Sequence, residues 1–317
     1  MALQMDVGVM LGTFGEQASR ETIERLATAA EDGGFDAVWV GDHVTLPAEI
    51  PDTYPFSPSG EAPFDISQDV YDCFGVLSYL AGVTDDVDLG TNTCIVPYRH
   101  PVVLARNALT LEQLSGGRFD FGVAPGWLET EFEVLDVPFE ERGSRTDEFL
   151  ELFERARKEP ELAFEGPHHS VQRTGFHPTP PEGRPTVWVG GRSGASFRRL
   201  AEYGDGWTIF WDRPDTVAQT RERIMAAWED FDRAGTPEIA VTRATHLGTD
   251  TDRDADKPLV GEADDIVDDL AAYADAGTTR VVLDFYTRDV DEQLEQLERW
   301  RERVLPRLSD CDSDGGD

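Results

Sequence analysis

Lysine is almost absent from this chain of 317 residues, since only Lys158 and Lys257 occur. Acidic residues number 63 against 28 basic ones, which gives a formal net charge of -35. A surface field of this sign repels nucleic acid and anionic lipid, so neither is expected as a partner. Because the acidic residues recur along the whole chain and repel one another at low salt, we expect a halophilic protein, adapted to a salt-rich cytoplasm whose ions screen the charge.

Cysteine is also scarce, and long apolar runs do not occur. Cys73, Cys94 and Cys311 are odd in number, widely spaced and without a CxxC pair, which argues against a disulfide scaffold and favours a reducing compartment. No stretch approaches about 18 uninterrupted apolar residues. The first ten residues, MALQMDVGVM, lack the basic region and apolar core of a signal peptide. We therefore expect a cytoplasmic protein, neither secreted nor inserted in a membrane.

Short β-rich segments alternate with helix-period segments eight times along the chain. This alternation is typical of βα units and predicts an α/β fold, a (β/α)8 TIM barrel with insertions in its loops. Such barrels commonly form one domain of more than about 200 residues, so we expect a single domain over residues 1–308 and an acidic, disordered tail over 309–317. The predicted strands are residues 5–11, 36–41, 87–92, 118–123, 186–190, 206–211, 238–247 and 279–285.

The first and last predicted helices are expected to meet where the barrel closes. The first begins after Ser19, a candidate N-cap, and the last carries an apolar face from Val290 to Val304. Long irregular segments interrupt the units at residues 44–68, 160–183 and 248–260, and loops of this length are usually functional or mobile. The first of them leaves strand two at the catalytic face, either as a lid or as a rigid, proline-pinned decoration.

The strongest acid/base candidates stand where strand two ends. The sequence VWVGDH places Asp42 and His43 at the C-terminal end of that strand, where barrel enzymes keep their working groups. Imidazole titrates near neutrality, and a neighbouring carboxylate can orient it, so the pair suits proton transfer. The structural alternative is a capping aspartate beside a surface histidine.

Two other strand ends carry residues suited to a flat ligand. Strand three ends in Gly90-Thr91-Asn92, where backbone without a side chain allows close approach of a ligand. Strand four ends in Pro125-Gly126-Trp127, and the indole of Trp127 either stacks on a planar ring system or belongs to the core.

A phosphate site is predicted after strand five, where the chain reads VWVGGRSGAS. The residues from Gly190 to Gly194 lie between a strand and a helix N-terminus, so amides freed by glycine, the helix dipole and Arg192 combine there. The segment lacks the lysine of a P-loop and the GxGxxG pattern of dinucleotide sites. Its position departs from the common barrel arrangement, in which phosphate binds after strands seven and eight.

Six segments in order resemble the luciferase-like monooxygenase superfamily, in particular its branch of F420-dependent oxidoreductases, from residue 5 to about residue 300. They are GFDAVWVGDH (34–43), the long run from LGTNTC to APGW (89–127), EF (131–132), VPFEERG (137–143), VWVGGRSGAS (187–196) and GDGW (204–207). The resemblance implies a (β/α)8 barrel, in agreement with the count of eight units, and hydride chemistry on coenzyme F420 held in the barrel mouth.

The resemblance also assigns roles to residues. Asp42 would contact the coenzyme ring, and His43 would move the proton near the reacting carbon. A bulge at Asn92-Thr93, often a non-proline cis peptide in the family, would support the ring from behind. The remaining coenzyme contacts that the resemblance implies are Ile95, Pro125, Gly126 and Thr130, with Gly190, Gly191, Ser193 and Gly194 in the phosphate loop, to which the sequence itself adds Arg192.

The substrate pocket departs from that of the sugar-phosphate dehydrogenases in the same superfamily. Their catalytic glutamate after the glycine that matches Gly126 is replaced by Trp127, and their phosphate-binding lysine by Arg213. Phe210 and Trp211 make the surroundings more apolar. We therefore expect a small organic substrate, uncharged or compatible with aromatic walls, rather than glucose 6-phosphate.

Several alternatives remain at this point. Within the family, the alternative to an F420-dependent enzyme is an FMN-dependent monooxygenase that uses reduced flavin and oxygen. Outside it, the barrel would be a non-catalytic coenzyme carrier, or a metal-assisted isomerase or hydrolase with Asp42, His43 and His246 as ligands. The six histidines show no ligand spacing and no HExxH, so no metal site is predicted. The family also implies a homodimer.

Overall fold

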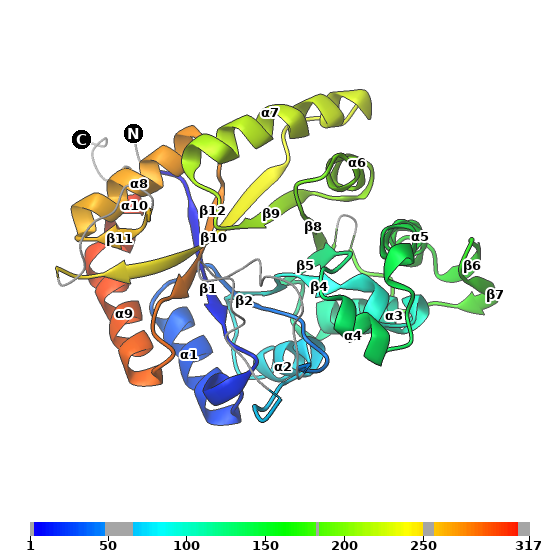
Figure 1. Ribbon diagram of the computed structural model, residues 1–317, viewed down its shortest axis with the longest axis horizontal. Coiled ribbons are helices and arrows are strands. Elements are labelled where there is room, and N and C mark those ends of the chain that lie inside the picture. The colour runs from blue at the N-terminus through cyan, green and yellow to red at the C-terminus, as the bar shows by residue number, and fades with distance from the viewer. Residues whose placement is uncertain (1–2, 48–65, 182–183, 250–256, 310–317) are drawn as a thin grey trace, which may run out of the picture.

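The computed structural model describes residues 3–47, 66–181, 184–249 and 257–309. In these residues eight parallel strands form a closed barrel in the order β10-β12-β1-β2-β3-β5-β8-β9, and β9 pairs back with β10 (Figure 1). The TIM barrel prediction is thereby confirmed. The barrel strands are β1 (Asp6–Leu11), β2 (Ala37–Val40), β3 (Asp88–Thr91), β5 (Phe119–Ala124), β8 (Thr186–Gly190), β9 (Gly206–Phe210), β10 (Glu238–Leu247) and β12 (Arg280–Phe285).

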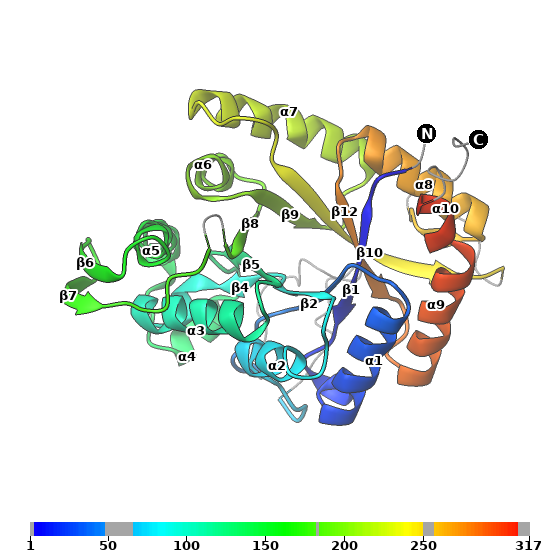
Figure 2. The ribbon, with the colours of Figure 1, turned by 180° about the vertical axis from the view of Figure 1, so that it is seen from behind.

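Helices cover the outside of the barrel, as both views show (Figure 1, Figure 2). The hydroxyl oxygen of Ser19 caps α1 by accepting a hydrogen bond from the Thr22 amide at 3.1 Å, and α1 packs against α9, so the predicted closure is confirmed. No helix in the described ranges has the length and apolar character needed to cross a membrane. The helices are α1 (Arg20–Asp32), α2 (Cys73–Leu80), α3 (Pro101–Leu114), α4 (Glu129–Val134), α5 (Arg142–Ala156), α6 (Gly194–Tyr203), α7 (Pro214–Asp230), α8 (Ala263–Asp275), α9 (Val290–Arg303) and α10 (Leu305–Ser309).

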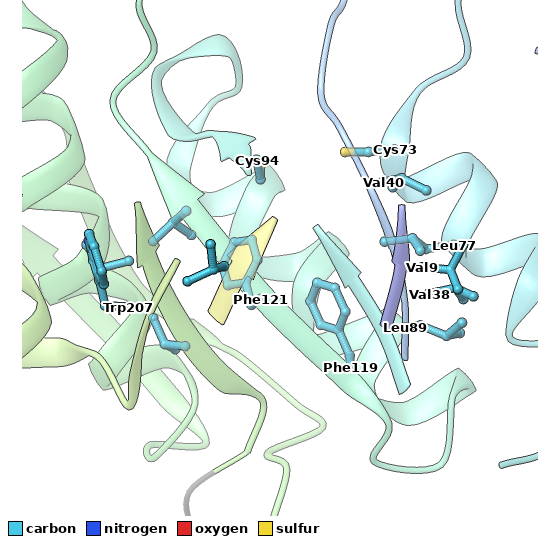
Figure 3. Packing of buried hydrophobic residues seen from close by; sticks show 14 of the residues in the cluster. Val9, Val38, Val40, Cys73, Leu77, Leu89, Cys94, Phe119, Phe121 and Trp207 are labelled. Carbon is cyan, nitrogen blue, oxygen red and sulfur yellow. The ribbon is translucent and has the colours of Figure 1, made fainter. Parts of the chain in front are cut away.

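Strand alternation divides the apolar residues into two cores. Outward-facing residues such as Val9, Val38 and Phe121 pack between the strands and the helices (Figure 3). The inward-facing Trp39 and Trp188 fill the barrel itself, together with Ala37, Ala240 and Val282. Glycine at two strand positions leaves room for the indole rings, because a side chain there would clash with them. A Cβ atom at Gly90 would lie 2.3 Å from Trp39, and one at Gly206 would lie 2.4 Å from Trp188.

An ionic cluster around the buried side chains of Arg280 and Asp120 occupies the N-terminal end of the barrel. The Arg280 guanidinium pairs with the carboxylates of Asp120, Asp6 (3.0 Å) and Asp88 (3.3 Å). Burial, followed by repulsion from Asp120, raises the pKa of Asp88 to about 6, although Arg280 opposes the shift. This cluster lies at the end of the barrel opposite the strand ends that carry the site.

The structure differs from the predicted irregular segments where it can be compared with them. The segment predicted to be irregular at residues 160–183 contains the antiparallel hairpin of β6 (Glu161–Glu165) and β7 (Ser170–Gly175), which lies at the outer edge of the molecule beyond α5 (Figure 1, Figure 2). The short strands β4 (Cys94–Ile95) and β11 (Val260–Gly261) also escaped prediction. Residue 309 ends α10, and the rest of the predicted tail, residues 310–317, lies outside the described residues. The same holds for most of the predicted loops 44–68 and 248–260.

Candidate active site

His43 is held in a polar contact at the C-terminal end of β2. Its Nδ1 atom lies 2.8 Å from Oε2 of Glu131, a residue of α4, the short helix that follows β5. The His43 side chain is 14% exposed and that of Glu131 only 1%. A mostly buried imidazole with a buried carboxylate on one nitrogen is suited to proton transfer at the other.

Four donors converge on Glu131. Its Oε1 atom accepts the amides of Val44 at 2.9 Å and Thr45 at 3.2 Å, and its Oε2 atom accepts the phenol of Tyr98 at 3.0 Å as well as His43. Burial and the adjacent Glu131 carboxylate raise the pKa of Tyr98, so its hydroxyl stays a donor. Because Glu131 acts as an acceptor throughout, we assign the proton of neutral His43 to Nδ1, which directs the lone pair of Nε2 away from Glu131.

Asp42 has different partners from those predicted. Its carboxylate binds Arg99 through both oxygens, at 2.6 and 2.8 Å, and accepts the Ile95 amide at 2.9 Å. The Asp42 side chain is fully buried. The carboxylate that contacts His43 is therefore Glu131 and not Asp42, which instead fixes the backbone after β2 against β4. A contact between Asp42 and the coenzyme ring stays a prediction.

The bulge after β3 has the conformation that the resemblance implies. The peptide bond between Asn92 and Thr93 is cis. The Asn92 side chain donates to Oγ1 of Thr242 at 2.6 Å and accepts the hydroxyl of Thr208 at 3.0 Å, so it bridges the barrel interior to two strands on the other side. The hydrogen bonds of Asn92 to Thr242 and Thr208 thus hold the bulge in place from the barrel interior, beside the ends of strands β2 and β5.

Other predicted coenzyme contacts surround this bulge. Gly126 follows Pro125 with φ at +87°, and a Cβ atom there would lie 2.6 Å from Cγ2 of Ile95. The hydroxyl oxygen of Thr130 is buried and makes no hydrogen bond within the described part of the chain. A buried hydroxyl without a partner is costly, and a polar ligand atom would satisfy it. The residues present therefore fit a polar, ring-shaped group at the mouth.

The predicted phosphate loop joins β8 to α6. Gly191 has φ at +106°, and the Ser193 hydroxyl caps α6 by accepting the Ser196 amide at 3.1 Å. Residues 192 to 195 are exposed, so their amides face solvent at a helix N-terminus. Arg192 is half exposed and pairs with Asp212 while donating to the Phe210 carbonyl at 3.0 Å. Its charge is thus partly compensated, and the amides and the helix dipole are the main anion-binding features.

The residues predicted to line a substrate pocket lie on three elements. Trp127 is partly exposed in the turn between β5 and α4, and Phe210 is the partly exposed last residue of β9. Arg213 is the N-cap residue of α7 and pairs with Asp215 at 3.1 Å. Each follows the C-terminal end of a barrel strand, the end where His43 stands. A role in substrate binding stays a prediction for all three.

Comparison with known proteins identifies the family. The family model described as luciferase-like monooxygenase matches residues 5–259. The chain belongs to the luciferase-like monooxygenase family. A relative in Mycobacterium tuberculosis, uncharacterized protein Rv0940c, is 26% identical over 291 residues, which cover 89% of this chain and 94% of that protein.

Solved structures share the luciferase-like fold over nearly the whole chain. Monooxygenase RslO1 from Streptomyces bottropensis superposes with a TM-score of 0.79 at 19% identity, covering 96% of this chain and 100% of that one. An F420-dependent secondary alcohol dehydrogenase in complex with an F420-acetone adduct gives 0.77 at 16% identity, covering 97% and 100%. Oxidoreductases of two kinds therefore share this architecture.

Sequence reasoning missed three residues of this luciferase-like site: Glu131, Tyr98 and Arg99. Glu131 belongs to one of the resembling segments and lies in the helix that follows the fourth barrel strand, but among 63 acidic residues one helical glutamate is not distinctive. The metal reading with His43 and His246 gains no support, because in the described ranges the one three-residue cluster of ligand atoms is Asp42, Cys73 and Cys94.

Proposed function

We propose that this luciferase-like chain is an F420-dependent oxidoreductase that transfers a hydride between the deazaflavin and a small organic substrate. When bound, the coenzyme would supply hydride chemistry at its C5 carbon. The residues that would hold it are Asn92, Thr93, Ile95, Pro125, Gly126 and Thr130 around the ring, Gly190, Gly191, Arg192, Ser193 and Gly194 at the phosphate, and Asp42 through its backbone.

His43 handles the proton in this proposal. The Glu131 carboxylate holds Nδ1 as a donor, so Nε2 is the ring nitrogen that would exchange a proton with the substrate oxygen. When the imidazole becomes charged, the buried carboxylate stabilises it without reorganisation, because its other three donors keep it in place. The His43–Glu131 contact is the observation that carries the proposal.

A binding titration tests the coenzyme class. The absorbance and fluorescence of F420 and of FMN would be followed separately with purified protein in molar KCl. We expect F420 to bind with micromolar or tighter affinity and FMN much more weakly. The reverse preference would contradict the proposal.

The second candidate is an FMN-dependent monooxygenase, favoured by the similarity to monooxygenase RslO1 over nearly the whole chain. Oxygen uptake separates the two functions, because deazaflavin reacts poorly with oxygen. Substrate-dependent oxygen consumption with reduced FMN would support the monooxygenase. Hydride transfer from reduced F420 without oxygen uptake would support the leading proposal. A homodimer in the cytoplasm remains an expectation for either enzyme.

A further inference from the structure

A buried group of metal-ligand atoms lies beside the active site but outside the proton relay. A carboxylate oxygen of Asp42 and the sulfur atoms of Cys73 and Cys94 all lie within 4.8 Å of one another, and all three residues are buried. The Cys73 thiol donates to Oδ1 of Asp42 at 3.5 Å. Figure 3 shows both cysteines toward the same end of the barrel strands.

We propose that Asp42, Cys73 and Cys94 bind one thiophilic divalent metal ion of the zinc class. Two thiolates and a carboxylate are ligands that zinc and cadmium prefer, and a tetrahedral ion bound by three protein atoms keeps its fourth position for water. Ion and ligands combine by exchange, in which the two thiols lose two protons to solvent and two metal–sulfur bonds form. No oxidant or reductant takes part.

The charges around the cluster act in both directions, since the Arg99 guanidinium repels a cation while the Asp42 and Asp72 carboxylates attract one. Arg99 contacts both sulfur atoms, at 3.8 and 3.9 Å, and pairs with Asp42 and, at 2.6 Å, with Asp72. Two carboxylates against one guanidinium leave the group negative before any thiol is ionised, which attracts a cation. Exchange of two protons for one divalent ion keeps that total charge, so the buried site gains no uncompensated charge.

Protons and metal ions compete for the sulfur atoms of Cys73 and Cys94. A metal ion competes directly with those protons, because only the thiolate is a ligand. Binding should therefore release protons and weaken as the pH falls.

The position of the cluster gives the ion a structural effect. Asp42 directly follows β2 and Cys73 begins α2, so the two ligands stand at opposite ends of a long connecting segment, 31 positions apart. The sulfur atom of Cys94, in β4, lies within 4.8 Å of the ligand atoms of both. Clips that close long loops restrict the unfolded chain, so a bound ion should stabilise the fold.

The test uses the C311S variant, in which Cys73 and Cys94 are the remaining thiols. Cadmium ion alone is titrated into this protein in molar KCl with excess magnesium, which occupies surface carboxylates. We expect one cadmium per chain, an ultraviolet thiolate-to-cadmium absorption band, release of two protons per ion and a higher Tm. Zinc should displace cadmium and abolish the band.

Two further variants in the C311S background assign the ligands. C73A and C94A should each weaken cadmium binding by at least about 100-fold, since loss of an outer partner alone costs about 10- to 100-fold. If one of these variants fails to fold, the absorption band and the number of protons released by the C311S protein still show whether cadmium binds to the two thiols. Absence of the band, no proton release, or equal binding by a folded C73A or C94A variant would overturn the proposal, whichever coenzyme the enzyme uses.

Discussion

At the scale of single residues, Glu131 controls the chemistry that His43 can perform. Glu131→Gln keeps the shape but replaces an acceptor by an amide, which can donate to Nδ1 and reverse the tautomer of His43. We expect kcat for hydride transfer to fall by about 10²- to 10⁴-fold. Pre-steady-state and steady-state kinetics across a pH series would measure the loss.

Tyr98→Phe is the matched control for this prediction. It removes one of the four hydrogen bonds to Glu131 but keeps the contact with His43. We expect kcat within about tenfold of the parent, because a single hydrogen bond contributes about 1 kcal/mol. A Glu131→Gln variant with the kcat of the parent would remove Glu131 from the mechanism.

Gly126 occupies a position that no other residue fits well. With φ at +87° and Ile95 Cγ2 in the way at 2.6 Å, Gly126→Ala should lower the free energy of unfolding by about 1–3 kcal/mol. Urea unfolding would measure the change. The control is Gly75→Ala in α2, where the nearest atom is 3.8 Å away and helix propensity predicts a gain of about 0.5–1 kcal/mol. Equal effects of both variants would contradict this account.

At the scale of elements, the sequence predicts the barrel well because its signals are periodic. Each predicted strand overlaps a barrel strand, and Ser19 caps α1 as its residue type indicates. The β6–β7 hairpin was missed although Leu162 and Phe164 alternate with exposed residues, since prolines and histidines around it favour a loop. Contacts such as His43–Glu131 join positions 88 residues apart, and no local pattern encodes that distance.

The start of α6 provides a test of the phosphate loop. Ser193→Ala removes the cap and should lower stability by about 1 kcal/mol. It should also weaken F420 binding, because the loop that presents the amides loses its anchor. Ser19→Ala is a matched control, since Ser19 caps α1 with the same bond length of 3.1 Å, away from the phosphate loop. The two variants should lose similar stability, and Ser193→Ala alone should lose coenzyme affinity. Equal F420 affinity in both would place the phosphate elsewhere.

At the scale of the whole molecule, the ionic cluster at the base of the barrel makes stability depend on pH. The pKa of Asp88 is raised from 3.8 to about 6 in the folded state. Its contribution to stability is therefore complete below about pH 4 and is lost as the pH rises through about 6. Asp88→Asn should reduce the loss of stability between pH 4 and pH 7.

Urea unfolding at several pH values in constant molar KCl would measure this effect. Asp85→Asn, an exposed position in the preceding turn, is the control and should leave the pH dependence of the parent unchanged. An Asp88→Asn variant with the full pH dependence of the parent would show that other carboxylates govern this range.

The net charge of -35 leads to a prediction about salt. Self-repulsion is screened over about 3 Å at 1 M salt but acts over about 30 Å at 0.01 M. We expect Tm to fall when KCl is lowered from molar to millimolar concentration, and sucrose at equal osmotic strength should not restore it. Unchanged stability across that range would refute adaptation to salt.

The pairing of β1 with β12 determines when this protein can complete its fold during synthesis. Asp6 and Arg280 face each other across that pair, so the first strand waits for the last. Until β12 has been synthesised and has left the ribosome, β1 presents a free hydrogen-bonding edge and its apolar side chains lack one neighbour. The edge of β1 can pair with another chain until β12 emerges, so residues that disfavour edge-to-edge pairing at β1 matter most in that interval.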